Sequence, residues 1–108
     1  MLKVHARNLG AVTVLCLRGR MVDGETAVLS DAVHSQSGVG TVVLDLRQVS
    51  TIDARSLGVM LELRQETCAR GIDFKLMNVT KLVSDVLERT RLNSVFEVAC
   101  GLATFSEA

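Results

Sequence analysis

Short apolar runs rich in β-branched residues alternate along this chain with segments of helical period. The clearest run is Thr41–Leu46, TVVLDL, which is apolar on both faces, as in a strand that is covered on both sides or central in a sheet. A second run, Val12–Arg18, lies between two glycines, and Leu2–Arg7 is expected to pair with it as a hairpin. The alternation predicts an α/β fold with a small mixed sheet of about four to five strands, flanked by amphipathic helices.

Three segments have the apolar spacing of amphipathic helices, namely Thr26–Gln36, Ala54–Arg70 and Lys81–Thr90. In the longest, the expected inner face consists of Leu57, Met60, Leu61, Arg64 and Cys68. In the last, the expected stripe is Leu82, Val83, Val86 and Leu87, with Asn78 or Thr80 as the cap. Further strands are expected at Phe74–Val79 and Val95–Ala99, with a final turn of helix from Leu102. We expect residues 1–108 to form one domain.

The charge balance and the aromatic content exclude several classes of partner. Twelve basic and twelve acidic residues give a net charge of zero, which argues against nucleic-acid binding through phosphates and against attraction to an anionic membrane. The chain has no Trp or Tyr and three Phe, so stacking platforms for bases are not expected either. No apolar run reaches the roughly 18 residues that cross a bilayer, and the start does not resemble a secretory signal. These features predict a cytoplasmic protein without membrane insertion.

Cysteine and histidine offer no catalytic or metal-binding pattern. Cys16 and Cys68 are expected to pack in the core as reduced thiols, and Cys100 is expected to be exposed. The acidic residue nearest to His34 in sequence is Asp31, and a single pair is too few ligands for zinc. Phosphate-binding glycine loops and nucleophile motifs are absent from the sequence. We therefore expect no metal, no cofactor and no enzymatic activity.

A series of motifs follows the order found in one known family. The sequence has Asp45 after a strand, Ile52-Asp53 at a loop, Leu57-Gly58 in the following helix, Gly71 at its end and Asn78 after the next strand. Upstream, LRGRMVDGETAVL supplies Gly19 and the loop residue Asp23. This pattern resembles the STAS domain, the fold shared by bacterial anti-sigma factor antagonists and the tails of sulfate transporters. The resemblance covers nearly the whole chain.

The resemblance implies a protein-binding module that docks a kinase-type, ATP-binding anti-sigma factor and so releases a sigma factor. In the family, the kinase phosphorylates a serine at the start of the long helix, where free N–H groups and the helix dipole tolerate phosphate. In this chain Ala54, Arg55 and Ser56 follow Asp53, and Arg55 occupies the position of that serine. The ordinary switch is therefore missing, and Ser56 is the candidate phosphorylation site.

A structural role stays open for each candidate site residue. Asp53 is either a helix cap, with Ser50 to Asp53 also at capping-box spacing, or a contact for the partner. Arg55 is either a solvated side chain or a contact for an acidic partner, and Asp23 is either a turn residue or part of the docking surface. Asp45 is expected to accept a local backbone N–H.

One alternative function is a permanent cytoplasmic STAS subunit of a lipid or solute transport complex, which the missing phosphosite favours. An enzyme or ligand carrier would need a pocket with convergent polar groups, for which the sequence offers no set of residues. The sequence leaves the oligomeric state open.

Overall fold

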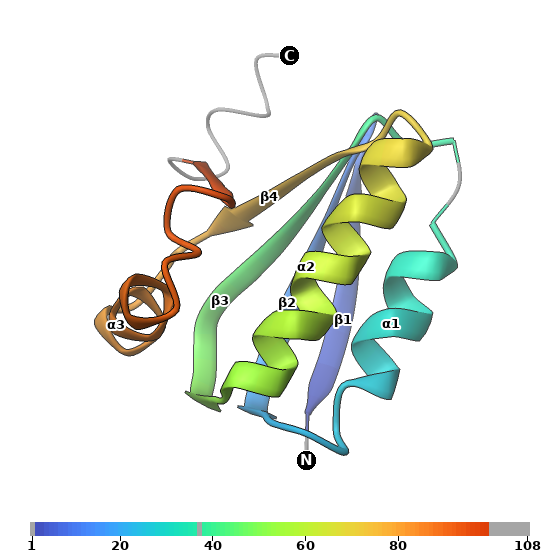
Figure 1. Ribbon diagram of the computed structural model, residues 1–108. Coiled ribbons are helices and arrows are strands. Elements are labelled where there is room, and N and C mark those ends of the chain that lie inside the picture. The colour runs from blue at the N-terminus through green and yellow to red at the C-terminus, as the bar shows by residue number, and fades with distance from the viewer. Residues whose placement is uncertain (1, 37, 100–108) are drawn as a thin grey trace.

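The computed structural model describes residues 2–36 and 38–99, which form a five-stranded sheet in the order β1-β2-β3-β4-β5 with three helices (Figure 1). The strands are β1 (Lys3–Leu9), β2 (Val12–Met21), β3 (Thr41–Ile52), β4 (Asp73–Met77) and β5 (Glu97–Ala99). The helices are α1 (Ala27–His34), α2 (Ala54–Ala69) and α3 (Lys81–Arg89). β1 is antiparallel to β2, and the other neighbouring strands are parallel. The predicted mixed sheet with flanking helices is confirmed.

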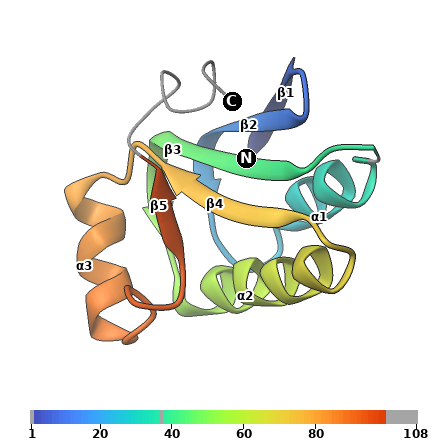
Figure 2. The same ribbon diagram turned by 90° about the horizontal axis from the view of Figure 1, so that it is seen from above.

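The strands lie in the sheet in the order of the chain, and this determines which face the helices cover. A crossover between parallel strands is almost always right-handed, so successive crossovers in one direction place their helices on the same face. Figure 2 shows α1 and α2 on one side of the sheet and α3 beside β4 and β5. The main core lies between the sheet and the helices, and it includes Leu15, Leu44, Leu29, Met60 and Val83.

β3 is the central strand, which explains why its sequence is apolar on both faces. Val42 and Leu44 face the helices, and Val43 lies in a second buried cluster with Val12, Val14 and Met77 on the opposite face. The strand continues past the predicted end at Leu46 as far as Ile52, because residues 48–52 still pair with β2. The pairing of β2 with β3 shifts in register between Cys16 and Arg18 and again between Gly19 and Arg20, and the two strands remain neighbours across these irregularities.

The buried stripe of α2 differs from the prediction. The buried residues are Ser56, Leu57, Met60, Leu63 and Thr67, and Cys68 is exposed. Thr67 takes the inner position because its hydroxyl donates to the Arg64 carbonyl at 3.0 Å, which satisfies the polar group inside the helix. The predicted burial of Leu57 and Met60 is confirmed, and the second half of the predicted stripe lies about one position too late.

The helix ends agree more closely with the sequence. Gly71 follows α2 with a φ of +76°, a left-handed conformation that glycine adopts without strain. Thr80 caps α3 by accepting the backbone N–H of Val83 at 3.4 Å. Leu82 is 43% exposed, so its predicted place on the buried stripe is wrong. The predicted exposure of Cys100 and the helical turn from Leu102 lie outside the described residues.

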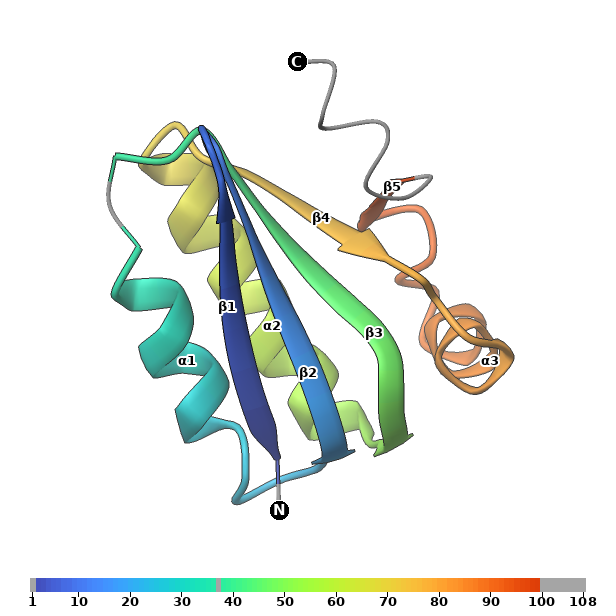
Figure 3. The same ribbon diagram turned by 180° about the vertical axis from the view of Figure 1, so that it is seen from behind.

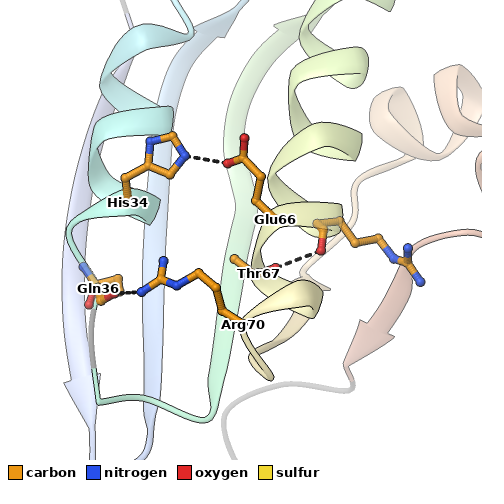
Figure 4. Close-up of polar contacts among 6 residues, drawn as sticks. His34, Gln36, Glu66, Thr67 and Arg70 are labelled. Carbon is orange, nitrogen blue, oxygen red and sulfur yellow. Dashed lines mark hydrogen bonds and ion pairs between the residues drawn. The ribbon is translucent and has the colours of Figure 1, made fainter.

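Two polar contacts join α1 and α2 near their carboxyl ends (Figure 4). His34 Nε2 lies 2.6 Å from Glu66 Oε2, and Arg70 Nη2 donates to the Gln36 carbonyl at 3.1 Å. The acidic partner of His34 is therefore Glu66, brought in by the fold, rather than its sequence neighbour Asp31. These contacts hold the two helices together at the end of α2 opposite to Asp53.

Candidate functional site

The carboxyl ends of β2 and β3 place the candidate residues together. Met21 and Ile52 are paired at the ends of these parallel strands, and the Asp53 N–H donates to the Met21 carbonyl at 3.3 Å. The loop after β2, which carries Asp23, therefore lies against the start of α2. In α/β sheets, loops at the carboxyl ends of parallel strands commonly form binding sites.

Asp53 is the N-cap of α2 and forms a capping box with Ser56. Its Oδ1 accepts the Ser56 N–H at 2.8 Å, and the Ser56 hydroxyl oxygen accepts the Asp53 N–H at 3.2 Å. The predicted capping role of Asp53 is confirmed. The alternative box from Ser50 to Asp53 is wrong, because Ser50 lies within β3 rather than at a helix end.

The second carboxylate oxygen of Asp53 ties the β2 loop to the helix. Its Oδ2 accepts the backbone N–H of Asp23 at 2.9 Å. This bond from Asp23, followed by the backbone bond from Ser56, lowers the pKa of Asp53 below its ordinary value. Asp53 therefore stays ionised at neutral pH, and its charge lies at the positive end of the α2 dipole.

Arg55 and Asp23 form an exposed ion pair above this cap. Arg55 Nη1 donates to Asp23 Oδ2 at 3.2 Å, and the two side chains are 79% and 61% exposed. A cation in the first turn of a helix is disfavoured by the dipole, and the Asp23 carboxylate offsets that cost. Ala54 and Gly58 are exposed beside the pair. Asp23, Ala54 and Arg55 are predicted partner contacts, and we call them, together with Gly58, the docking surface, with Asp53 as its support.

Ser56 is part of the support rather than of the exposed surface. Its side chain is fully buried, and its hydroxyl donates to the Asp53 carbonyl at 2.8 Å besides accepting the Asp53 N–H. A kinase could reach this hydroxyl only after the first turn of α2 opens. Phosphorylation of Ser56 stays a prediction.

Gly58 is the residue of this surface that sequence reasoning missed as a site residue. It lies inside α2, and a Cβ added there would meet no atom within 4 Å. A glycine in an exposed helix interior costs about 0.5 to 1 kcal/mol relative to alanine. An exposed glycine inside a helix, with no packing reason for it, is the signal that could have drawn attention to the position.

Asp45 and Cys16 lie together on the opposite face of the sheet. Asp45 Oδ1 accepts the Arg47 N–H at 3.0 Å, as predicted, and also a bond of 3.1 Å from Asn78 Nδ2. Cys16 is half-buried, and burial followed by the negative charge of Asp45 raises the pKa of its thiol. Cys16 is thus a poor nucleophile at neutral pH.

Neither a metal cluster nor a membrane span is found in the part of the chain that the structure describes. Over residues 2–36 and 38–99, no three His, Cys, Asp or Glu side chains are arranged to hold a metal ion. None of the described helices is both long and apolar enough to cross a membrane. A hollow of about 450 Å³ lies on the sheet face away from α1 and α2.

Comparison with known proteins gives a consistent family assignment. The sequence matches the STAS domain family over residues 3–106. TM1081 of Thermotoga maritima, a candidate anti-sigma factor antagonist, is 20% identical with a TM-score of 0.83 over 96% of this chain and 92% of its own. The anti-sigma factor antagonist SpoIIAA, in its unphosphorylated form, is 20% identical with a TM-score of 0.74 over 97% of this chain and 95% of its own.

A transporter relative has the same fold. A sulfate transporter family protein from Wolinella succinogenes is 20% identical with a TM-score of 0.72 over 82% of this chain and 75% of its own. SpoIIAA of Bacillus has also been solved in a phosphorylated form, at 18% identity and a TM-score of 0.67 over 97% of this chain and 98% of its own. No curated protein matches the chain significantly in sequence.

Proposed function

The chain belongs to the STAS domain family, and on that premise we propose that it is an anti-sigma factor antagonist that binds a kinase-type, ATP-binding anti-sigma factor in the cytoplasm. The docking surface at the start of α2 is the observation that carries this proposal. Structural relatives that include SpoIIAA support the antagonist role.

The chemistry of the docking surface fits an acidic partner. Arg55 projects from a helix start that the capping box fixes, and it is 79% exposed. Only Nη1 of its guanidinium bonds to Asp23, so the other donors are available for a carboxylate of the partner. Ala54 and Gly58 have little or no side chain, which allows a partner backbone to approach α2 closely.

The same geometry affects how phosphorylation would regulate the surface. The first turn of α2 contains one hydroxyl, that of Ser56, and it is buried within the capping box. A phosphate on Ser56 would break the bonds between its hydroxyl and the Asp53 backbone, and the Asp53 side chain in turn holds the β2 loop through Asp23. Modification would therefore loosen the docking surface instead of adding charge to an intact one.

A permanent subunit of a lipid or solute transport complex is the second candidate function. The burial of Ser56 favours it, because a surface that kinases cannot easily reach suits a constant contact. The similar fold of a sulfate transporter family protein also supports this candidate.

The deciding experiment is affinity purification from the native cell with three versions of the chain. The wild type is compared with Arg55→Glu, which reverses the charge at that position, and with Arg89→Glu at the exposed end of α3 as the matched control. We expect an ATP-binding anti-sigma factor with the wild type and the control, and its loss with Arg55→Glu. Recovery of transport subunits with the wild type and the control, but not with Arg55→Glu, would favour the second candidate function. Equal recovery of the partner with Arg55→Glu and with the wild type would contradict the assignment of the docking surface.

A restored serine tests the kinase. Arg55→Ser places an exposed hydroxyl at the position where the family has its phosphorylated serine. With the recovered anti-sigma factor and ATP, we expect intact mass to show more phosphate on Arg55→Ser than on the wild type, because the new hydroxyl is exposed and that of Ser56 is buried. An unmodified Arg55→Ser variant would argue that the partner is not a kinase for this surface.

A further inference from the structure

The sheet face opposite to α1 and α2 has a basic hollow beside the edge strand. Figure 3 views this face, with β1, β2 and β3 in front of α2. The hollow, of about 450 Å³, is lined by Lys3, Val4, His5, Cys16, Arg18 and Gln48. A smaller hollow of about 110 Å³ continues from it past Arg47 and Asp45.

The cations on this face follow from the register of the hairpin. Lys3, His5 and Arg7 alternate along β1, so their side chains share one face of the strand. Lys3 is paired with Arg18 on β2, which puts a further cation on the same face. The register shift between β2 and β3 brings Arg47 to the rim of the smaller hollow.

These cations are left without acidic partners among the residues that the structure describes. No hydrogen bond or ion pair within that part of the chain involves the side chains of Lys3, His5 or Arg7. Asp45 is the one carboxylate of the described residues that lines either hollow, and its Oδ1 is already bonded to Arg47 and Asn78. Although the net charge of the chain is zero, positive charge without an acidic partner among the described residues is thus concentrated at one place.

β1 also offers backbone groups. It pairs with β2 alone and lies at the end of the sheet, so alternate residues direct their N–H and C=O groups away from β2. An exposed edge strand of this kind is a template for an added strand. Side chains at alternate positions of such a strand would lie beside Lys3, His5 and Arg7.

We propose that β1 binds an extended acidic segment of a partner protein as an additional strand, with its acidic residues at alternate positions facing Lys3, His5 and Arg7. The backbone of β1 forms the hydrogen bonds with the added strand. The cations select a segment whose acidic residues occupy alternate positions. This site lies on the other face of the sheet from the core of α2, and it does not depend on the proposed function of the docking surface.

Charge argues against a second copy of this chain as the occupant. Antiparallel pairing of two β1 edges would bring the cations of both strands together on one face, and like charges directly opposite each other are destabilising. Single-stranded nucleic acid is disfavoured because its binding sites rely on stacking against large aromatic side chains, and no Phe, Tyr or Trp of the described residues lines the hollow. An extended acidic peptide complements the positive charge of this face and can also pair with the backbone of the β1 edge.

The experiment uses the full chain and a fluorescent peptide of alternating glutamate and threonine. We expect binding by anisotropy, and we expect the double variant Lys3→Gln, Arg7→Gln to weaken it about tenfold or more. The matched control is Lys81→Gln, Arg89→Gln, which removes the same charge from α3 and should leave binding unchanged. A peptide of the same composition with its glutamates consecutive should bind several-fold more weakly. Bound peptide should also protect the β1 amides that face away from β2 from hydrogen exchange.

Several results would overturn the proposal. One is absence of binding to the wild type at low salt. Another is equal weakening by the α3 control, which would indicate attraction to the net charge. Equal affinity for the consecutive-glutamate peptide, or unchanged exchange of the β1 amides, would exclude the added strand. Binding of a single-stranded oligonucleotide that is stronger than the peptide and sensitive to Lys3 and Arg7 would assign the face to nucleic acid. Since none of these assays involves Arg55, their failure leaves the docking surface untouched.

Discussion

The start of α2 and the basic face beside β1 are both exposed and both charged, but they hold their charges in different ways. At the start of α2, Asp53 accepts two backbone N–H groups, and Arg55 is paired with Asp23. Beside β1, Lys3 and Arg7 have no such partners among the described residues. In the first region, the charged groups bond to other parts of the chain and hold a loop against a helix. In the second region, the charged groups are available to another molecule.

This difference predicts two kinds of recognition. A surface whose polar groups are already bonded has a fixed shape, and a partner binds it without ordering loops first. Unpaired cations attract a partner over a longer range, and salt screens that attraction. Changes at the first region should therefore alter stability as well as binding, whereas changes at the second should alter binding alone.

The largest effect is expected from Asp53→Ala. The substitution removes the carboxylate that accepts the Ser56 N–H at the helix start and the Asp23 N–H in the β2 loop, so we expect a loss of about 1 to 2 kcal/mol in the free energy of unfolding. Urea denaturation measures it. Arg7→Ala on the basic face is the comparison and should stay within about 0.5 kcal/mol of the wild type. An equal loss of unfolding free energy in the two variants would mean that the cations beside β1 also form stabilising contacts within the chain.

The acid dependence of stability should distinguish the charge of Asp53 from its capping geometry. The pKa of Asp53 is lowered in the folded state from 3.8, so the unfolded chain takes up this proton first as the pH falls. Its contribution to stability is complete above 3.8 and is lost as the pH falls through the lower, folded pKa. Asp53→Asn keeps a good cap but cannot titrate.

Urea denaturation of the wild type and Asp53→Asn across the acidic range measures this contribution. The stability advantage of the wild type should shrink with falling pH. A difference that stays constant down to the most acidic condition would contradict the assignment. The same comparison with Arg7→Gln should show no such pH dependence in this range, because arginine keeps its charge.

Much of the fold was predictable because periodicity and glycine positions report local structure directly. The run at Thr41–Leu46 predicted the central strand, and Gly71 predicted the end of α2. The errors come from contacts that distant residues supply. Pairing with β2 extends β3 to Ile52, and the buried hydroxyl bond of Thr67 shifts the stripe of α2 away from Cys68.

That the candidate residues lie together was predictable from the sequence, but their hydrogen bonds and ion pair were not. Asp53, Arg55 and Asp23 were selected from the motif order, and the adjacent ends of β2 and β3 do bring them together. No local pattern reveals that the partner of Arg55 is Asp23, because the two are separated by α1 and β3. The cations beside β1 were overlooked for a related reason, since a net charge of zero hides an uneven distribution.

A smaller effect is expected from Gly58→Ala. The added methyl group meets no atom within 4 Å, and alanine is favoured over glycine inside a helix, so we expect a gain of about 0.5 to 1 kcal/mol in stability. Thermal unfolding measures the gain. In the purification experiment the same variant should recover less partner, because the methyl group occupies the docking surface. Undiminished recovery would place the contact away from Gly58.

The smallest effect is expected from the pair of Arg55 and Asp23. Both side chains are more than half exposed, at 79% and 61%, so a double-mutant cycle with Arg55→Ala and Asp23→Ala should give a coupling of about 0.2 to 0.5 kcal/mol, decreasing with added salt. Equilibrium unfolding of the four proteins measures it. A coupling above about 1 kcal/mol would mean that the pair is a structural lock, leaving little of Arg55 for a partner. A weak coupling together with loss of the partner in Arg55→Ala would show that Arg55 serves recognition. In this region, the charge of Arg55 is then the one that contributes least to the stability of the fold.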